Sequence, residues 1–335
     1  MTRLTWSAAL LAALAGVLIS AAPAKSPNFP ARIDLPVSPT GVGNRNFSAE
    51  GIATGRGHTF YLGNTSTDLT NIYSGSVLVG DYRTGTTSVL VPGGLGRSIL
   101  GVFVDNHNRV WGAGGGTGKA YVFDGSTGEP LAEYELTTAT PRLINDVVVT
   151  DTAAYFTNTL GAQVVFKVPL GPGGELPPAN PSPVQTLTLS PGFPGSNGID
   201  VLPDGNLIVV SITNGNLYKV DPNTGAATQI VVDGTLLSGD GLILNGGTLY
   251  YVENRAANNA TQPGDIVVVQ LSSDFTTGHI VMHLNSPDDP LSGPATADQF
   301  GHYIYVVRRN VPTVPPTDRV NWLTQIVKPH LEDSD

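Results

Sequence analysis

Four side chains with oxygen donors stand at matching places in a repeated unit of the sequence, and together they could bind a metal ion. They are Glu50, Asn145, Asn197 and Asp240, each about nine or ten residues before a pair of aromatic or aliphatic residues. Two carboxylates and two carboxamides, with no Cys or His, suit Ca²⁺ or Mg²⁺ better than Zn²⁺ or Cu²⁺. The alternative is that Asn and Asp here only make the turns that begin strands, although such turns do not require Glu50.

The repeated unit is clearest between residues 197 and 225. Aliphatic runs at 199–202, 207–212 and 217–220 are separated by Pro-Asp-Gly, Thr-Asn-Gly and Asp-Pro-Asn-Thr-Gly, which are turn signals, and a fourth run follows at 227–232. This pattern predicts a four-stranded antiparallel meander. Such a meander is one blade of a β-propeller.

Six copies of the unit cover the chain after its N-terminal segment. Their anchor pairs recur every 40 to 55 residues or so, a spacing typical of propeller blades; they are Phe60-Tyr61, Val110-Trp111, Tyr155-Phe156, Leu207-Ile208, Leu249-Tyr250 and Ile304-Tyr305. We therefore expect an all-β fold, a six-bladed β-propeller of four-stranded blades that forms one domain over residues 25–330. A short strand within 32–37 is expected to close the ring beside 322–327, and residues 331–335 are expected to be a disordered tail.

Composition agrees with this fold and narrows the class of partner. The 335 residues include 40 Gly and 26 Pro, and only 13% are charged, as in a chain with many hairpins. The net charge is −10 and no cluster of Lys and Arg occurs, so nucleic acid and anionic membrane surfaces are poor partners. Small molecules are the better candidates.

The first 24 residues resemble a secretory signal. Arg3 precedes an apolar run at 8–19 and then Ala22-Pro23-Ala24. A transmembrane anchor is the weaker alternative because the run is shorter than the roughly 20 residues that a bilayer needs. We expect a secreted protein with no membrane insertion after signal cleavage, and with glycosylation sequons at Asn46, Asn64 and Asn259. Since the chain has no Cys, its stability does not depend on disulfides.

Other catalytic motifs are missing from the sequence. There is no Gly-x-Ser-x-Gly, which disfavours a serine hydrolase of that type, and the six His residues share no metal-ligand spacing. The Gly-rich stretch 112–119 departs from the phosphate-loop pattern and favours a hairpin between two strands.

The mature chain resembles the regucalcin/gluconolactonase family of six-bladed propellers. The resemblance rests on Ala-Glu-Gly-Ile at Glu50, an Asn-Asp step at Asn145, an Asn-Gly step at Asn197 and an Asp-Gly step at Asp240. It implies that these residues form a metal and polar site, as in a metal-dependent lactonase. The family's Arg before its Asn-Asp step is displaced here to Arg142, which weakens the transfer of sugar-lactone specificity. Strictosidine-synthase relatives have a Glu where this chain has Val209-Val210-Ser211, so Pictet–Spengler chemistry is not supported.

Within this group, residues 60–64, 77–85 and 145–150 are most similar to the fungal hetero-Diels–Alderases of tropolonic sesquiterpene pathways. That resemblance implies the joining of a tropolone quinone methide to a hydroxylated humulene, a reaction that requires no cofactor and is promoted by holding two apolar partners together. Candidates for the apolar pocket walls are Phe103, Trp111, Tyr155 and Tyr251, with packing between blades as the alternative for each. We expect this cycloaddition. A metal-dependent lactone hydrolase, or a secreted propeller that only binds, is the alternative.

Overall fold

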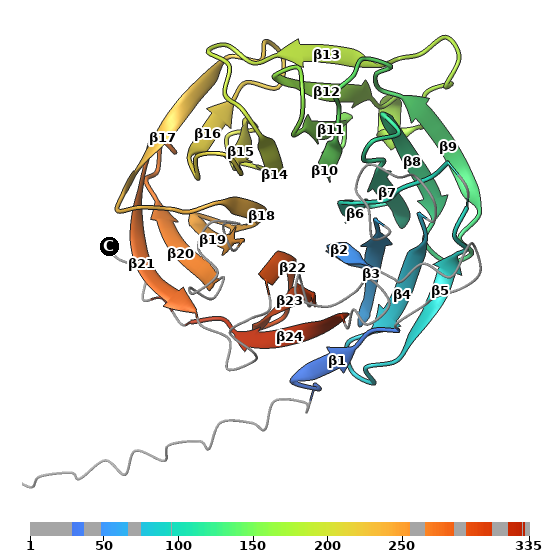
Figure 1. Ribbon diagram of the computed structural model, residues 1–335, viewed down its shortest axis with the longest axis horizontal. Helices are drawn as coiled ribbons and strands as arrows, with labels where there is room; N and C mark the ends of the chain where they lie inside the picture. Colours follow the sequence, from blue (N-terminus) through green and yellow to red (C-terminus); the bar gives the residue numbers. More distant parts are fainter. Residues whose placement is uncertain are drawn as a thin grey trace, which may run out of the picture.

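The computed structural model describes residues 29–36, 48–65, 75–94, 96–254, 265–284, 293–309, 321–329 and 331. Their strands follow one another as meanders around a central channel, and the chain passes round the ring in sequence order (Figure 1). The predicted all-β propeller is therefore confirmed. The expected signal peptide, Asn46, Asn259 and all of the expected tail except Leu331 lie outside the described residues.

Blades one to three are four-stranded antiparallel meanders, each with its first strand beside the channel. Blade one consists of β2 (Ala49–Thr54), β3 (Thr59–Asn64), β4 (Val77–Asp81) and β5 (Thr87–Val91). Blade two consists of β6 (Val102–Val104), β7 (Arg109–Ala113), β8 (Lys119–Asp124) and β9 (Pro130–Glu135). Blade three consists of β10 (Ile144–Val149), β11 (Ala153–Asn158), β12 (Val164–Pro169) and β13 (Gln185–Thr188), with a 3-10 turn η1 (Pro172–Gly174) before its last strand.

Blades four to six continue the same arrangement. Blade four consists of β14 (Ser196–Val201), β15 (Leu207–Ser211), β16 (Leu217–Val220) and β17 (Ala227–Asp233). Blade five consists of β18 (Gly239–Asn245), β19 (Thr248–Glu253), β20 (Asp265–Leu271) and β21 (Thr277–Leu284). Blade six consists of β22 (Gly293–Phe300), β23 (Tyr303–Arg309) and β24 (Asn321–Val327), with β1 (Arg32–Asp34) as its outermost strand. In the described part of the chain, no helix is long and apolar enough to cross a membrane.

The core lies between neighbouring blades. All six predicted anchor pairs fall in the second strand of a blade, and each of these side chains is at most 4% exposed. They belong to six apolar clusters, each of which joins two adjacent blades; in one of them Trp111 of blade two packs with Phe156 of blade three. Burial of these faces is the main stabilisation available to a chain without disulfides.

A repeated turn connects the third and fourth strands. In blade one, Asp81 Oδ1 accepts hydrogen bonds from the main-chain N–H groups of Arg83 (2.8 Å) and Thr84 (2.9 Å), and Gly85 follows with φ 70°. The same turn recurs at Asp124 and at Asp221. A left-handed residue is needed after the Asp, which explains why Gly ends each of these turns.

The N-terminal strand closes the ring, as the sequence predicted. Strand β1 pairs antiparallel with β24, with Ile33 opposite Leu323, and in Figure 1 it lies on the outer side of β24. Ile33 is 2% exposed and packs in the cluster between blades six and one. Closure thus joins residues from both ends of the described chain in one blade.

Blades four and five share an edge that the sequence did not predict. Their outermost strands, β17 and β21, pair in parallel over three residues, with Asp233 opposite His279. The two blades therefore form one eight-stranded sheet, while the other four blades are separate sheets.

Candidate metal centre

The four oxygen donors lie in β-bulges at the beginning of innermost strands. In five of the six blades the pairing of the first strand with the second is interrupted near its start, for example between Ala49 and Ile52. Glu50, Asn145, Asn197 and Asp240 each occupy such an interruption. A bulge leaves residues out of the ladder and re-aims their side chains.

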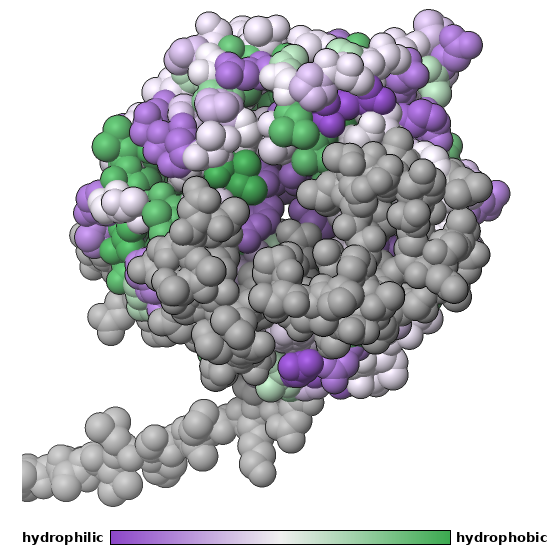
Figure 2. Space-filling model, viewed as in Figure 1, coloured by the Kyte–Doolittle hydropathy of each residue, from purple (hydrophilic) through white to green (hydrophobic). Residues whose placement is uncertain are grey.

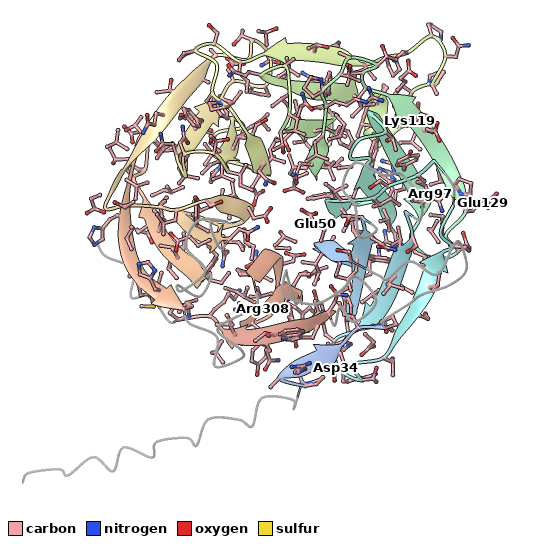
Figure 3. All side chains as sticks on the ribbon, viewed as in Figure 1. Asp34, Glu50, Arg97, Lys119, Glu129 and Arg308 are labelled. Atoms are coloured by element: carbon pink, nitrogen blue, oxygen red, sulfur yellow. The ribbon has the colours of Figure 1, made fainter. Side chains whose placement is uncertain are left out.

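These four residues come together at one point of the channel. They line a single cavity of about 10 Å³, together with Gly51, Asp146, Gly241 and Thr296. Each of the four is buried, with 2 to 6% of its surface exposed. Figure 3 shows Glu50 at the end of β2 nearest the centre of the ring. A cavity of this size is sufficient for about one water molecule or small ion.

The remaining two blades contribute no carboxylate or carboxamide at this position. The bulge registers align Ala295, rather than Thr296, with Glu50, because Ala297 and Ile52 are the equivalent paired residues that follow. Thr296, one residue after Ala295, lines the cavity instead. It lies close to Gly241, since a Cβ atom on Gly241 would be 2.1 Å from Thr296 Oγ1. In blade two the position is Leu100, whose carbonyl oxygen accepts a hydrogen bond from Gly51 N (3.1 Å).

Hydrogen bonds within the blades and between blades three and four hold the site in place. Asp240 Oδ2 accepts a bond from Asn254 Nδ2 (2.6 Å). The buried hydroxyl of Thr157 donates to the carbonyl oxygen of Asn197 (2.7 Å) and accepts from Asp146 N (3.1 Å). The side chain of Asp240 and the main chain at Asn197 and Asp146 are therefore fixed before any ligand binds.

Further along the channel, a larger cavity of about 240 Å³ is lined by three more carboxylates, Asp146, Asp200 and Asp298. Each one joins two blades by accepting two main-chain N–H bonds. Asp200, for example, accepts from Val201 in its own strand (2.7 Å) and from Leu244 of the next blade (2.8 Å). Asp146 and Asp298 bridge in the same way to Ile199 and Thr54.

The channel is strongly acidic. Burial raises the pKa of Asp146 to about 7, against the two N–H bonds that favour its charged form, and the negative charges of Asp240 and Asp200 raise it further. Burial likewise raises the pKa of Asp200 to about 6, with a contribution from the charge of Asp298. Five carboxylates thus line adjoining cavities, which favours occupation by a cation.

The donor set is poor in the usual metal-ligating side chains. Within the described ranges, no group of three or more His, Cys, Asp and Glu side chains could hold a metal ion. A cation at the small cavity would therefore depend on the two carboxamides as well as on Glu50 and Asp240. Ca²⁺ accepts carboxylate, carboxamide and water oxygens together, so the set fits this ion.

Solved structures share the overall arrangement. Neither a protein-family model nor a curated protein sequence matches the chain. A calcium-binding protein, regucalcin, from Agrobacterium tumefaciens matches with 15% identity and a TM-score of 0.56, over 90% of this chain and 96% of that one. A gluconolactonase from Xanthomonas campestris matches with 17% identity and a TM-score of 0.54, over 84% of this chain and 87% of that one. A putative 6-phosphogluconolactonase from Bacteroides uniformis has 16% identity and a TM-score of 0.53, over 83% and 84%.

The chain has the fold of these propellers. At such low identity, the likeness is evidence for the fold alone.

Of the four aromatic residues expected in a pocket, Phe103 alone lines a described cavity. Trp111 is fully buried, with its Nε1 donating to Asp105 Oδ2 (2.8 Å). Tyr155 packs in the cluster between blades three and four, and the hydroxyl of Tyr251 donates to the carbonyl oxygen of Leu237 (2.6 Å). These three side chains therefore lie in the core between blades rather than on the wall of a described cavity.

The sequon at Asn64 does not fit a glycan in the folded protein. Asn64 is 2% exposed; its Oδ1 accepts a bond from Ser48 N, and its Nδ2 donates to Ser76 Oγ, both at 3.0 Å. A sugar on Nδ2 would require this buried amide to leave its strand, and glycosylation at Asn64 stays a prediction.

Sequence reasoning missed the carboxylates of the larger cavity. Asp146 was part of the Asn-Asp step, but Asp200 and Asp298 follow a bulge and point into the channel only because the bulge shifts the alternation of side chains. For Asp200, the signal that could have found it is an Asp inside the aliphatic run 199–202, whereas the strand that holds Asp298 reads Gly-Pro-Ala-Thr-Ala-Asp-Gln-Phe and carries no such signal.

Proposed function

We propose that the protein is a metal-dependent hydrolase that opens a small lactone at the channel mouth where the innermost strands begin. The observation that carries this proposal is the meeting of Glu50, Asn145, Asn197 and Asp240 on one cavity of about 10 Å³. The fold likeness to a gluconolactonase and a putative 6-phosphogluconolactonase supports the choice of a lactone.

The four side chains would hold a hard cation such as Ca²⁺ through their oxygens. Bound there, it would supply Lewis acidity toward a carbonyl oxygen and toward water. Of the four residues, Glu50 and Asp240 are the ones with a carboxylate that can accept a proton from the attacking water. Asn254 Nδ2 fixes the orientation of Asp240, while Asn145 and Asn197 add neutral oxygens that limit charge repulsion.

The test is to incubate the purified protein with a panel of aldonolactones and to monitor ring opening through the proton that each acid product releases. The proposal predicts turnover that chelator removes and Ca²⁺ restores. It also predicts that Asp240→Ala removes turnover, while Glu135→Gln, on an exposed acid far from the channel, retains it. Turnover that persists in Asp240→Ala, or no turnover of any lactone by calcium-loaded protein, would reject it.

The second candidate is the hetero-Diels–Alder reaction of a tropolone quinone methide with a hydroxylated humulene. The similarity of residues 60–64, 77–85 and 145–150 to enzymes of that reaction is the observation that favours it. Such a reaction is accelerated by orientation and by a hydrogen-bond donor to the developing oxyanion, so it should survive chelation if the fold does. Adduct yield and stereochemistry equal to a protein-free control would eliminate it.

We further propose that the mature protein acts after secretion. The charged, apolar and small-residue regions within residues 1–24 support this. N-terminal sequencing of protein recovered from the medium should begin close to Lys25. Recovery of the full-length chain inside the cell would contradict it.

A further inference from the structure

A third cavity, of about 690 Å³, lies at the other end of blades two and three. It is formed by the turns that follow the innermost strands β6 and β10 and by the segment 170–174 after β12. The candidate metal centre instead lies where innermost strands begin. All innermost strands run the same way along the channel, so the two sites open toward opposite ends of it. In Figure 2, hydrophilic side chains are visible at the upper side of the central opening.

A buried arginine is held rigidly at this cavity. Asp105 Oδ2 accepts bonds from Arg109 Nε (2.6 Å) and Trp111 Nε1 (2.8 Å), and its Oδ1 accepts from the main-chain N–H groups of His107 (2.9 Å) and Arg109 (3.0 Å). The side chains of Arg109 and Asp105 are only 10% and 5% exposed. Asp105 therefore has four donors already, and its role is to fix the guanidinium of Arg109.

The outer edge of that guanidinium and the ring of His107 converge on one point of the cavity. A Cβ atom placed on Gly174 would lie 2.7 Å from His107 Nε2 and 3.7 Å from Arg109 Nη2. Among the described residues, His107 Nε2 and the two Nη atoms of Arg109 have no hydrogen-bond partner. Gly174, with φ 80°, leaves this point open.

The remaining walls are mostly apolar. Phe103, Val104, Val149 and Leu170 line the cavity, and Phe103 also lines the acidic channel. The other carboxylate of the cavity, Asp151, accepts a bond from Asn106 Nδ2 (3.3 Å). A cavity of this size and lining is typical of small-molecule sites.

We propose that this cavity binds a small organic acid, with its carboxylate between Arg109 and His107 and its apolar body against Phe103, Val149 and Leu170. A guanidinium offers two parallel N–H groups that match the two oxygens of a carboxylate. The site is independent of the candidate metal centre. No residue is shared between the two cavities.

The probe is 4-phenylbutyrate, compared with its uncharged amide, in calorimetric titrations of the mature chain with chelator present. The acid should bind with one molecule per chain, and the amide should bind about tenfold more weakly or worse, because it lacks the charge-assisted bonds. Binding of the acid should also change the fluorescence of Trp111, which shares Asp105 with Arg109.

Variants locate the site. His107→Ala and Gly174→Ala should each weaken acid binding about tenfold or more, the first by removing a donor and the second by filling the point between the donors. His302→Ala, in the corresponding turn of blade six, is the matched control and should bind as the parent does. Arg109→Gln should abolish binding; if it fails to fold, His107→Ala, at an exposed residue, decides the matter. Equal binding of acid and amide, no binding of either, or unchanged acid binding by His107→Ala would overturn the proposal.

Discussion

Gly101 of blade two and Asp146 of blade three share a space that holds only one side chain. A Cβ atom on Gly101 would lie 2.3 Å from Asp146 Oδ1 and 2.7 Å from the carbonyl oxygen of Asn145. Gly101 N donates a hydrogen bond to that same oxygen (2.8 Å). The small residue in one blade thus determines how closely the metal-centre strand of the next can approach.

Gly101→Ala should therefore destabilise the fold by about 1 to 3 kcal/mol, the usual cost of forcing a methyl group into a packed site. It should also weaken cation binding, because the added methyl group displaces Asn145. Urea unfolding measures the first effect and calorimetry the second. Gly94→Ala is the control, since its Cβ would make only ordinary contact with Arg97 Nη2 at 3.5 Å. Equal stability of the two variants would show that the blades adjust freely.

The carboxyl of Asp200 should make stability depend on pH. Its pKa in the folded protein is about 6, above the ordinary 3.8, so the folded state retains a proton that the unfolded state has lost. The contribution is fully present below about pH 4 and disappears as the pH rises through about 6. The difference between the folded and unfolded pKa of Asp200 corresponds to a change of at most about 3 kcal/mol in the free energy of unfolding.

Asp200→Asn stays neutral at every pH and lacks this loss. Measured in chelator, its free energy of unfolding should therefore increase relative to that of the parent as the pH rises from 4 to 7, which means that the variant becomes relatively more stable. Denaturant titrations at several pH values measure the difference, with Asp34→Asn, on an exposed side chain, as the control. A difference between Asp200→Asn and the parent that does not vary with pH would contradict the assignment.

Ring closure by β1 should be a large part of the stability. Ile33→Ala removes a buried side chain opposite Leu323 and should cost about 2 to 5 kcal/mol. Val327→Ala, on the same blade but with 65% of the residue exposed, should cost much less. Matched urea curves for the two variants give the comparison, and similar midpoints would mean that β1 adds little to the ring.

Several features of the fold could be predicted because they repeat. The anchor pairs, such as Phe60-Tyr61, recur with their turns, and the repeat gave the six blades and the phase of Glu50 and Asp240. Closure by β1 followed because a ring needs a partner for its last strand. The lateral pairing of β17 with β21 was not predictable, since it depends on how far two outer edges extend toward each other in space.

Within the sites, the spacing of the repeats predicted where in a blade a residue lies, but not which groups surround its side chain. Asn145 and Asn197 repeat with the blades, but whether Trp111 or Tyr251 faces a cavity depends on packing across blades, which has no signature in one strand. Arg109 and His107 meet Gly174, which lies about 65 positions later in the chain, and nothing in the local sequence of either segment marks this contact.

The central claim is that four side chains from four blades hold one hard cation. Calorimetric titration of chelator-treated protein with Ca²⁺ tests it most directly. The account predicts one ion per chain, with affinity at least about tenfold lower in Glu50→Gln and in Asp240→Asn, because each loses a charged ligand, and unchanged in Glu135→Gln. Absence of binding by the folded parent, or equal affinity in all four proteins, would contradict it.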